Sequence, residues 1–132
     1  MEKNPKVLIV DDDPDFVETT KIVLESKSYE VSSASGPDEG FKKVGEENPD
    51  LIILDVMWPN KISGFEVCRR LKKDADSKNI PILMITAVDE KYELGFENVA
   101  GDGTWLPTDD FLSKPVEPEV LLSKVGELLP KI

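Results

Sequence analysis

Short apolar runs alternate along the chain with segments whose apolar residues recur at helical spacing. The runs are rich in β-branched residues and are bounded by charged or turn-forming residues, which is typical of β-strands. The predicted strands are Val7–Val10, Tyr29–Ala34, Leu51–Leu54, Ile80–Ile85 and Phe111–Ser113. The second run is the most polar, as expected for a strand at the edge of a sheet, whereas the longer apolar runs indicate strands that are covered on both faces.

The segments that follow these strands predict helices. They are the segment that begins at Pro14, Asp38–Glu46, the stretch around Phe65–Leu71, Glu90–Phe96 and Glu119–Leu129. Asp13 is expected to be the N-cap of the first helix, because it stands directly before a proline at the first helical position. A loop is expected from Trp58 to Gly64. The pattern is weakest from 88 to 108, where glycines and prolines interrupt it.

Strands and helices that alternate in this way, joined by short loops, predict a mostly parallel sheet with helices on both faces and right-handed crossovers. The fold class is therefore α/β. A chain of 132 residues has the length of one ordinary domain, so residues 1–132 are expected to share a single folded unit.

Acidic, hydroxyl and basic residues come directly after four of the predicted strands. They are Asp11, Asp12, Asp55, Thr86 and Lys114. Parallel strands end at one edge of their sheet, and ligands in such sheets bind just beyond that edge, so we expect these side chains to converge. Neighbouring carboxylates repel each other, and burying them requires a compensating cation, for which a divalent ion is suited.

Composition limits the chemistry of this site. The net charge of −11 disfavours direct binding to nucleic acid, and the absence of histidine excludes histidine-based triads and metal sites. No apolar run approaches the roughly 20 residues of a membrane span. The first residues lack a signal-peptide pattern, and the single Cys68 has no disulfide partner within the chain and is expected to be a packing residue. These features predict a cytoplasmic protein that does not bind membranes.

A carboxylate cluster with a lysine and a hydroxyl fits the transfer of a phosphoryl group onto a carboxylate. In this scheme Asp55 is the nucleophile, and Asp11 and Asp12 hold Mg²⁺ directly or through water. Lys114 pairs with one phosphoryl oxygen, and Thr86 donates to another. No G-x-x-x-x-G-K-[ST] or G-x-G-x-x-G pattern follows the first strand, so nucleotide hydrolysis and dinucleotide binding fit poorly.

Four segments carry a resemblance to a known family. VLIVDDDPDF, LIILDVMWP, ILMITA and DFLSKPVEPEVL closely resemble, in this order, the signature segments of two-component response-regulator receiver domains, the CheY-like family. The resemblance extends from about Lys6 to Leu129. It implies a flavodoxin-like, doubly wound sheet of five parallel strands in the order 2-1-3-4-5.

The resemblance also implies roles for the acidic residues. Asp55 is the residue phosphorylated by a partner histidine kinase or phosphotransfer protein. Asp12 is a direct ligand of Mg²⁺, Asp11 is a partly water-mediated ligand, and the backbone carbonyl of Met57 is a third; Asp55 also belongs to the metal site.

By the same resemblance, Thr86 and Phe111 form a switch pair, a hydroxyl that moves towards the phosphoryl group and a ring that turns inward. Phosphorylation then changes the surface around the fourth and fifth helices. The protein is a signalling receiver that catalyses only its own phosphorylation and slow dephosphorylation. Its kinase, its output target and its state as a monomer or homodimer stay open, as does whether the chain stands alone or belongs to a longer regulator.

Two loops depart from the family's usual spacing. The loop 59–64 is one residue longer, and the segment 86–114 is several residues longer. Trp105 and Leu106 in the second insertion form either local packing, which we favour, or a docking patch. Family positions two residues beyond Asp55 and Thr86 flank the path of attacking water, and here they are the apolar Met57 and Val88, so a long-lived phosphoryl group is expected.

Two alternative functions remain open. Asp11 and Asp13 also form a D-x-D pattern, as in haloacid-dehalogenase-like phosphohydrolases, with Asp11 as the nucleophile. That family needs an acidic pair after its lysine, whereas residues 109–110 precede Lys114, and the chain has no room for a cap domain. The other alternative is a degenerate receiver that serves only as a docking module.

Overall fold

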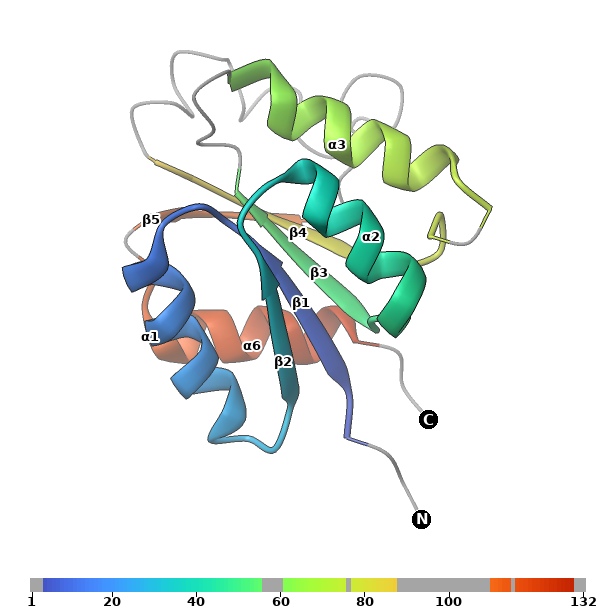
Figure 1. Ribbon diagram of the computed structural model, residues 1–132. Helices are drawn as coiled ribbons and strands as arrows, with labels where there is room; N and C mark the ends of the chain where they lie inside the picture. Colours follow the sequence, from blue (N-terminus) through green and yellow to red (C-terminus); the bar gives the residue numbers. More distant parts are fainter. Residues whose placement is uncertain (1–3, 56–60, 76, 88–109, 115, 130–132) are drawn as a thin grey trace.

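The computed structural model describes residues 4–55, 61–75, 77–87, 110–114 and 116–129, with the backbone alone for 61–66, 86–87, 110–111 and 113–114. Five strands form one parallel sheet in the order β2-β1-β3-β4-β5 (Figure 1). They are β1 (Lys6–Val10), β2 (Glu30–Ala34), β3 (Leu51–Asp55), β4 (Ile82–Ala87) and β5 (Asp110–Lys114). The predicted α/β class, the strand order and the edge position of β2 are confirmed.

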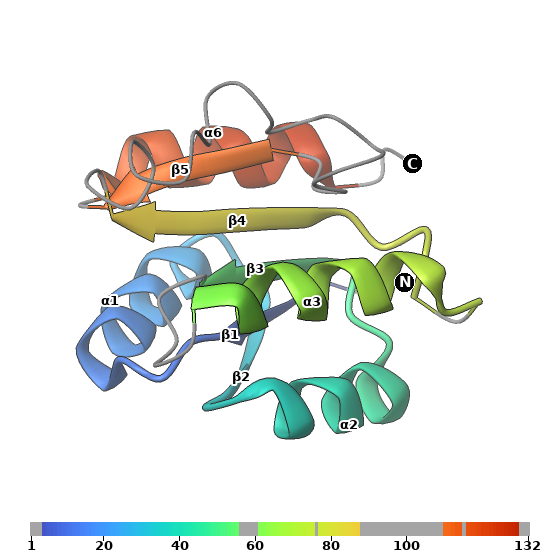
Figure 2. The same ribbon diagram turned by 90° about the horizontal axis from the view of Figure 1, so that it is seen from above.

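Helices cover both faces of the sheet. Those described are α1 (Pro14–Glu25), α2 (Pro37–Glu47), α3 (Lys61–Lys73) and α6 (Pro118–Leu128). Figure 2 shows α2 and α3 on one side of the sheet and α1 and α6 on the other, which is the doubly wound arrangement. The helix predicted at Glu90–Phe96 and the position of Trp105 lie outside the described residues.

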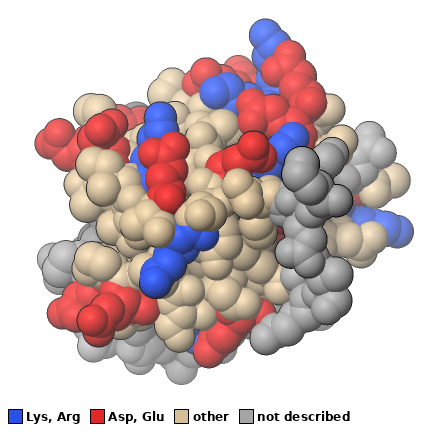
Figure 3. Space-filling view, turned by 90° about the horizontal axis from the view of Figure 1, so that it is seen from below, with Lys and Arg blue, Asp and Glu red and all other residues tan. Residues whose placement is uncertain are grey.

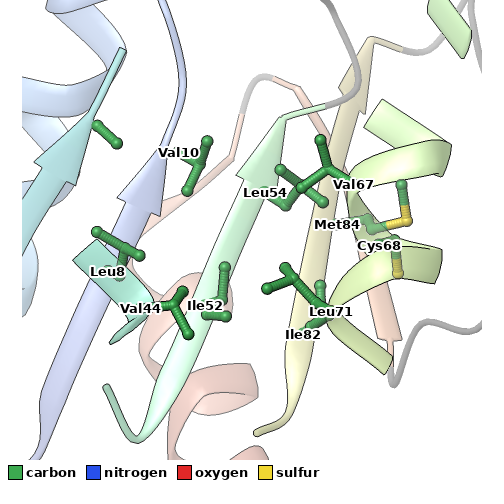
Figure 4. Packing of buried hydrophobic residues seen from close by; sticks show 11 residues of the cluster. Leu8, Val10, Val44, Ile52, Leu54, Val67, Cys68, Leu71, Ile82 and Met84 are labelled. Carbon is green, nitrogen blue, oxygen red and sulfur yellow. The ribbon is translucent and has the colours of Figure 1, made fainter. Parts of the chain in front are cut away.

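Two apolar clusters, one on each face, hold these layers together. Successive strand residues point to opposite faces, so each central strand supplies both clusters. The first cluster contains Leu8, Val10, Ala34, Val44, Ile52, Leu54, Val67, Cys68, Leu71, Ile82 and Met84, and Figure 4 shows strand side chains packed against α2 and α3. The second contains Val7, Ile9, Leu24, Leu51, Ile53, Leu83, Ile85, Leu121, Val125 and Leu129. Cys68 is fully buried, as predicted for a packing residue.

The start of α1 is fixed by its cap. The Asp13 carboxylate accepts hydrogen bonds from the backbone amides of Asp15, at 3.0 Å, and Phe16, at 3.4 Å, and Pro14 occupies the first helical position. These bonds satisfy amides that have no partner within the helix. The predicted N-cap is therefore confirmed, and the beginning of α1 is tied to the end of β1.

The start of α2 lies beside the end of β1. A Cβ atom on Gly40 would lie 3.3 Å from both Cγ atoms of Val10, so glycine lets this helix approach the strand closely. Glu39 reaches back to Ser35 and accepts hydrogen bonds from its amide, at 2.7 Å, and its hydroxyl, at 3.2 Å. On the same helix, Lys43 Nζ donates to the carbonyl of Ser33 in the edge strand β2.

Predicted boundaries differ from the structure by two residues or more in two regions. The loop expected to run to Gly64 ends earlier, because α3 begins at Lys61; a glycine in a helix costs about 1 kcal/mol relative to alanine but does not prevent the helix from forming. The strand expected over Ile80–Ile85 spans Ile82–Ala87, so Thr86 lies inside it and not after it. Pro81 has no amide hydrogen to give to a neighbouring strand, and the Ile80 amide donates to the Ser77 carbonyl in a turn instead.

The surface carries the negative charge of the composition. Figure 3 views the molecule from below, where α1 and α6 lie, and shows several groups of Asp and Glu side chains with a few Lys and Arg side chains between them. Val120 on α6 is 45% exposed, and Ile22 on α1 is 60% exposed. Among the described helices, none is both long enough and apolar enough to span a membrane.

The bond between Glu39 and Ser35 predicts a pH-dependent contribution to stability. The Ser35 amide, and then its hydroxyl, lower the pKa of the Glu39 carboxyl from its usual value. Because the folded state favours the ionised form, the stability from this bond is present above the usual glutamate pKa of about 4.3 and is lost as the pH falls through the lowered value. We therefore expect Glu39→Gln to lower the urea midpoint slightly at pH 7 and to differ little from wild type at pH 3.

The control is Glu46→Gln, which removes an exposed carboxylate from the same helix. Unfolding of all three proteins is followed by circular dichroism from pH 7 to pH 3. An equal effect of Glu39→Gln at both pH values would show that the carboxylate charge is not involved.

Candidate functional site

The pairing of β1 with β3 brings two aspartates together. Val10 and Leu54 are partners in this parallel register, and each is followed directly by an aspartate, Asp11 or Asp55. The two strands lie side by side in the middle of the sheet, so both residues emerge at its carboxyl edge (Figure 1). This confirms the expected convergence for these residues, although 44 residues separate them along the chain.

Three carboxylates form a compact acidic cluster at this edge. One carboxylate oxygen each from Asp11, Asp12 and Asp55 lies within 4.8 Å of the others. Asp11 is 3% exposed and Asp55 is 1% exposed, whereas Asp12 is exposed. Like charges 4 Å apart near a protein surface repel by about 4 kcal/mol, so the cluster has a strong electrostatic demand for a cation.

Backbone hydrogen bonds hold Asp11 from two sides. Its own amide donates to the Ala34 carbonyl at the end of β2, at 3.0 Å, which extends the pairing of β1 with β2 by one residue. Its Oδ1 atom accepts from the amide of Asp13, at 2.8 Å. The first bond fixes the backbone of Asp11 beside β2, and the second orients its carboxylate.

The donor set fits a divalent cation that prefers oxygen ligands. An octahedral ion with bonds of about 2.1 Å has a first shell roughly 4.2 Å across, close to the spread of the three oxygens. Its two positive charges would offset most of the repulsion, and exposed Asp12 leaves one side of the cluster open to solvent. The geometry supports a site that binds such an ion and leaves room for water or an anionic group.

Strands β4 and β5 carry the other candidate residues. Asp55 pairs with Ile85, which directly precedes Thr86, and Ala87 pairs with Lys114. The backbone thus places Thr86 and Lys114 at the same carboxyl edge as the acidic cluster. Phe111 pairs with Met84 and so lies further from this edge. Met57, Trp58 and Val88 lie outside the described residues.

The structure adds two contributors to this site that the sequence analysis did not identify. They are the Asp13 amide and the Ala34 carbonyl, both backbone groups. The run Asp11–Asp12–Asp13–Pro14 indicates a helix cap, but side-chain patterns carry no signal for which backbone amide meets which carboxylate. The Asp13 side chain is directed to the amides of α1, so it serves as a cap, which speaks against a D-x-D nucleophile pair.

Comparisons with known proteins agree with this geometry. The profile of the family described as "Response regulator receiver domain" matches residues 7–126. The alkaline phosphatase synthesis transcriptional regulatory protein PhoP of Bacillus subtilis is 40% identical over 128 residues, which are 96% of this chain and 49% of that protein. Protein PilH of Pseudomonas aeruginosa is 30% identical over 124 residues, 94% of this chain and 97% of its own.

A solved structure of a putative response regulator from Chloroflexus aurantiacus superposes on the chain with a TM-score of 0.81. It is 36% identical, and the match covers 98% of this chain and 100% of that chain. The chain spans about half the length of the first curated relatives it matches, since 49% of each is covered.

The acidic cluster predicts that divalent cations stabilise the fold. A ligand that binds only the folded state raises the free energy of unfolding by about 2.7 kcal/mol at 100 times its dissociation constant. We expect this rise for the wild type and its near absence in Asp11→Asn, since that variant removes a charge of the cluster. Thermal or urea unfolding with a divalent chloride salt and with a chelator measures the difference.

Glu25→Gln is the matched control, since it removes an exposed carboxylate at the far end of α1. It should keep the full stabilisation. Equal stabilisation of Asp11→Asn and wild type would place the cation elsewhere on the acidic surface.

Proposed function

The chain belongs to the response regulator receiver domain family, and on this basis we propose that Asp55 accepts a phosphoryl group in a Mg²⁺-dependent signalling switch. Receiver domains are phospho-accepting switches that work with a histidine kinase, and they are not enzymes that turn over a separate substrate. The proposal concerns which residues of this chain do the work. One observation carries it: Asp55 ends the central strand β3, almost fully buried, within reach of two further carboxylates.

The chemistry is a nucleophilic displacement at phosphorus. A carboxylate oxygen of Asp55 attacks the phosphorus of a phosphohistidine, the bond from phosphorus to nitrogen breaks, and the histidine leaves and takes up a proton. The product is an acyl phosphate on Asp55. Carboxylates are weak nucleophiles, so positioning and charge stabilisation supply most of the rate.

Asp11 and Asp12 are proposed to hold the Mg²⁺ ion, with Asp12 as the direct ligand and Asp11 acting partly through water. Asp55 and the backbone carbonyl of Met57 complete the set. Mg²⁺ usually keeps several waters and binds one or two carboxylates together with phosphate oxygens, and a cluster with one exposed and two buried carboxylates supports this mode. When bound, the ion screens the charge of the incoming phosphoryl oxygens.

Lys114 is proposed to pair with one phosphoryl oxygen, and Thr86 is proposed to donate a hydrogen bond to another. Thr86 lies near the end of β4, which pairs with β3, and Lys114 ends β5, which pairs with β4; these backbone positions support the proposed role. Movement of the Thr86 hydroxyl, with an inward turn of the Phe111 ring, would pass the charge change to the surface around the fourth and fifth helices of the family's fold. The last of these is α6 in this chain.

The remaining assignments are also proposals. Residues 1–132 form one receiver domain, and the protein acts in the cytoplasm without binding membranes or nucleic acid through these residues. The phosphoryl donor is a histidine kinase or phosphotransfer protein. PhoP is named a transcriptional regulator and this chain covers about half of it, whereas PilH has nearly the length of this chain. These relatives are compatible with output through a separate target or through a further domain.

Phosphorylation at Asp55 predicts the loss of labelling in one variant. With a small phosphodonor such as acetyl phosphate and Mg²⁺, we expect wild type to take up one phosphoryl group and Asp55→Asn to remain at background, because an amide oxygen does not replace the nucleophile. Mass spectrometry of the intact protein gives the occupancy. Hydroxylamine should release the label, as expected for an acyl phosphate.

Asp38→Asn, which changes an exposed carboxylate in α2, should be labelled like wild type. Undiminished labelling of Asp55→Asn would rule out the assignment. Turnover of a phosphomonoester that is lost in Asp11→Asn but not in Asp55→Asn would favour a phosphohydrolase instead. A wild type that binds Mg²⁺ but takes up no label from any donor would favour a docking module.

Met57 and Val88 predict the lifetime of the phosphoryl group. Both are apolar and offer no group that orients an attacking water, so we expect a longer lifetime in wild type than in the double variant Met57→Asn, Val88→Gln. Loss of label is followed after removal of the donor. The apolar double variant Met57→Leu, Val88→Ile is the control and should keep the wild-type lifetime; equal lifetimes in all three proteins would contradict the role of these positions.

A further inference from the structure

We propose that Asp13 is a positioning residue for cation binding, because it links the first turn of α1 to the carboxylate of Asp11. The inference rests on the proposed function, since it concerns the affinity of the same metal site. Asp13 is exposed, its side chain accepts from amides of α1 and it does not belong to the acidic cluster, so it is not offered as a ligand.

Asp13 makes two different kinds of hydrogen bond at the end of β1. Its backbone amide donates to Oδ1 of Asp11, at 2.8 Å, and its side chain accepts from the amides of Asp15 and Phe16. The backbone of Asp13 is extended, with φ −93° and ψ 105°, which is the conformation of an N-cap residue. The side-chain bonds hold this conformation, and the conformation aims the amide at Asp11.

This arrangement orients a buried carboxylate before any cation arrives. Asp11 is 3% exposed, and a hydrogen bond to one of its oxygens limits rotation of the group. Groups that orient metal ligands in this way typically change metal affinity by 10- to 100-fold when they are removed. Loss of the Asp13 cap should therefore weaken Mg²⁺ binding although no ligand atom is removed.

Loss of charge is the main competing explanation. Removing any carboxylate near the cluster weakens the attraction for a cation, so a single variant cannot separate orientation from charge. Asp13→Asn and Asp13→Ala carry the same charge, but asparagine keeps an oxygen that can accept from the amides of α1 and alanine does not. Asp15→Asn removes a charge two residues further along without touching the cap acceptor.

The experiment measures Mg²⁺ affinity by isothermal titration calorimetry at about 0.15 M salt, where exposed charges more than about 8 Å from the cluster are largely screened. We expect Asp13→Ala to bind Mg²⁺ roughly tenfold more weakly than Asp13→Asn, at the lower end of the range for orienting groups. Asp13→Asn and Asp15→Asn should lie close to each other, and Asp13→Ser, which restores a cap acceptor, should recover most of the loss.

A second readout follows the first turn of α1 without metal. Amide hydrogen exchange at Asp15 and Phe16 should be faster in Asp13→Ala than in Asp13→Asn, because the acceptor of both amides is gone. If Asp13→Ala does not fold, Asp13→Gly replaces it, since glycine lacks the acceptor but is tolerated at N-cap positions.

The outcomes separate this inference from the proposed function. If the wild type binds Mg²⁺ and is labelled on Asp55, but Asp13→Ala and Asp13→Asn bind Mg²⁺ equally well, the positioning role alone is overturned. No binding of Mg²⁺ by the wild type would overturn both. Weaker binding in Asp13→Ala, recovered in Asp13→Ser and accompanied by faster exchange at the first turn, supports the inference.

Discussion

The parallel register between β1 and β3 is the constraint on which the functional edge depends. Val10 lies beside Leu54, so the residues that follow them emerge side by side although they are far apart in sequence. A shift of one residue in this register would move each apolar side chain of β1 to the opposite face of the sheet and would bring Lys6 or Asp11 into the place of an apolar residue. The packing that holds the strands in place therefore also fixes where the carboxylates of Asp11 and Asp55 meet.

The close placement of these carboxylates lowers the stability of the fold but serves the proposed function. Two buried carboxylates and a third nearby repel one another. Burial of apolar side chains on both faces of the sheet supplies the free energy that offsets this repulsion. The cap of α1 lies at the same point, since Asp13 serves the helix with its side chain and Asp11 with its amide. The last residue of a strand, the beginning of a helix and the candidate metal site are thus one continuous piece of structure.

The sequence carried most of this architecture. Apolar runs followed by Asp11 and Asp55 predicted both the strands and the acidic cluster, because buried strands require apolar residues and a charged residue at the end of such a run is easily recognised. The strand order came from the family resemblance, since periodicity does not encode which strands are neighbours. Boundaries were predicted less well. The sequence suggested a loop as far as Gly64, but α3 tolerates this glycine and begins at Lys61. It suggested a strand from Ile80, but Pro81 has no amide hydrogen to donate and β4 begins at Ile82. The hydrogen bond from the Asp13 amide to Asp11 could not be predicted from the sequence, because nearly every residue has a backbone amide and only the fold shows where each one points.

The bond between Lys43 and Ser33 bears on a different property, the behaviour of the protein in concentrated solution. Among the described strands, β2 has a neighbour on one side only, and an uncovered strand edge is a template on which further chains add and aggregate. Lys43 reaches from α2 to one of its backbone carbonyls, and a charged ammonium group there makes the approach of another strand costly. Lys43, which in the sequence is one surface charge among many, thus disfavours the addition of another chain to the exposed edge of the sheet.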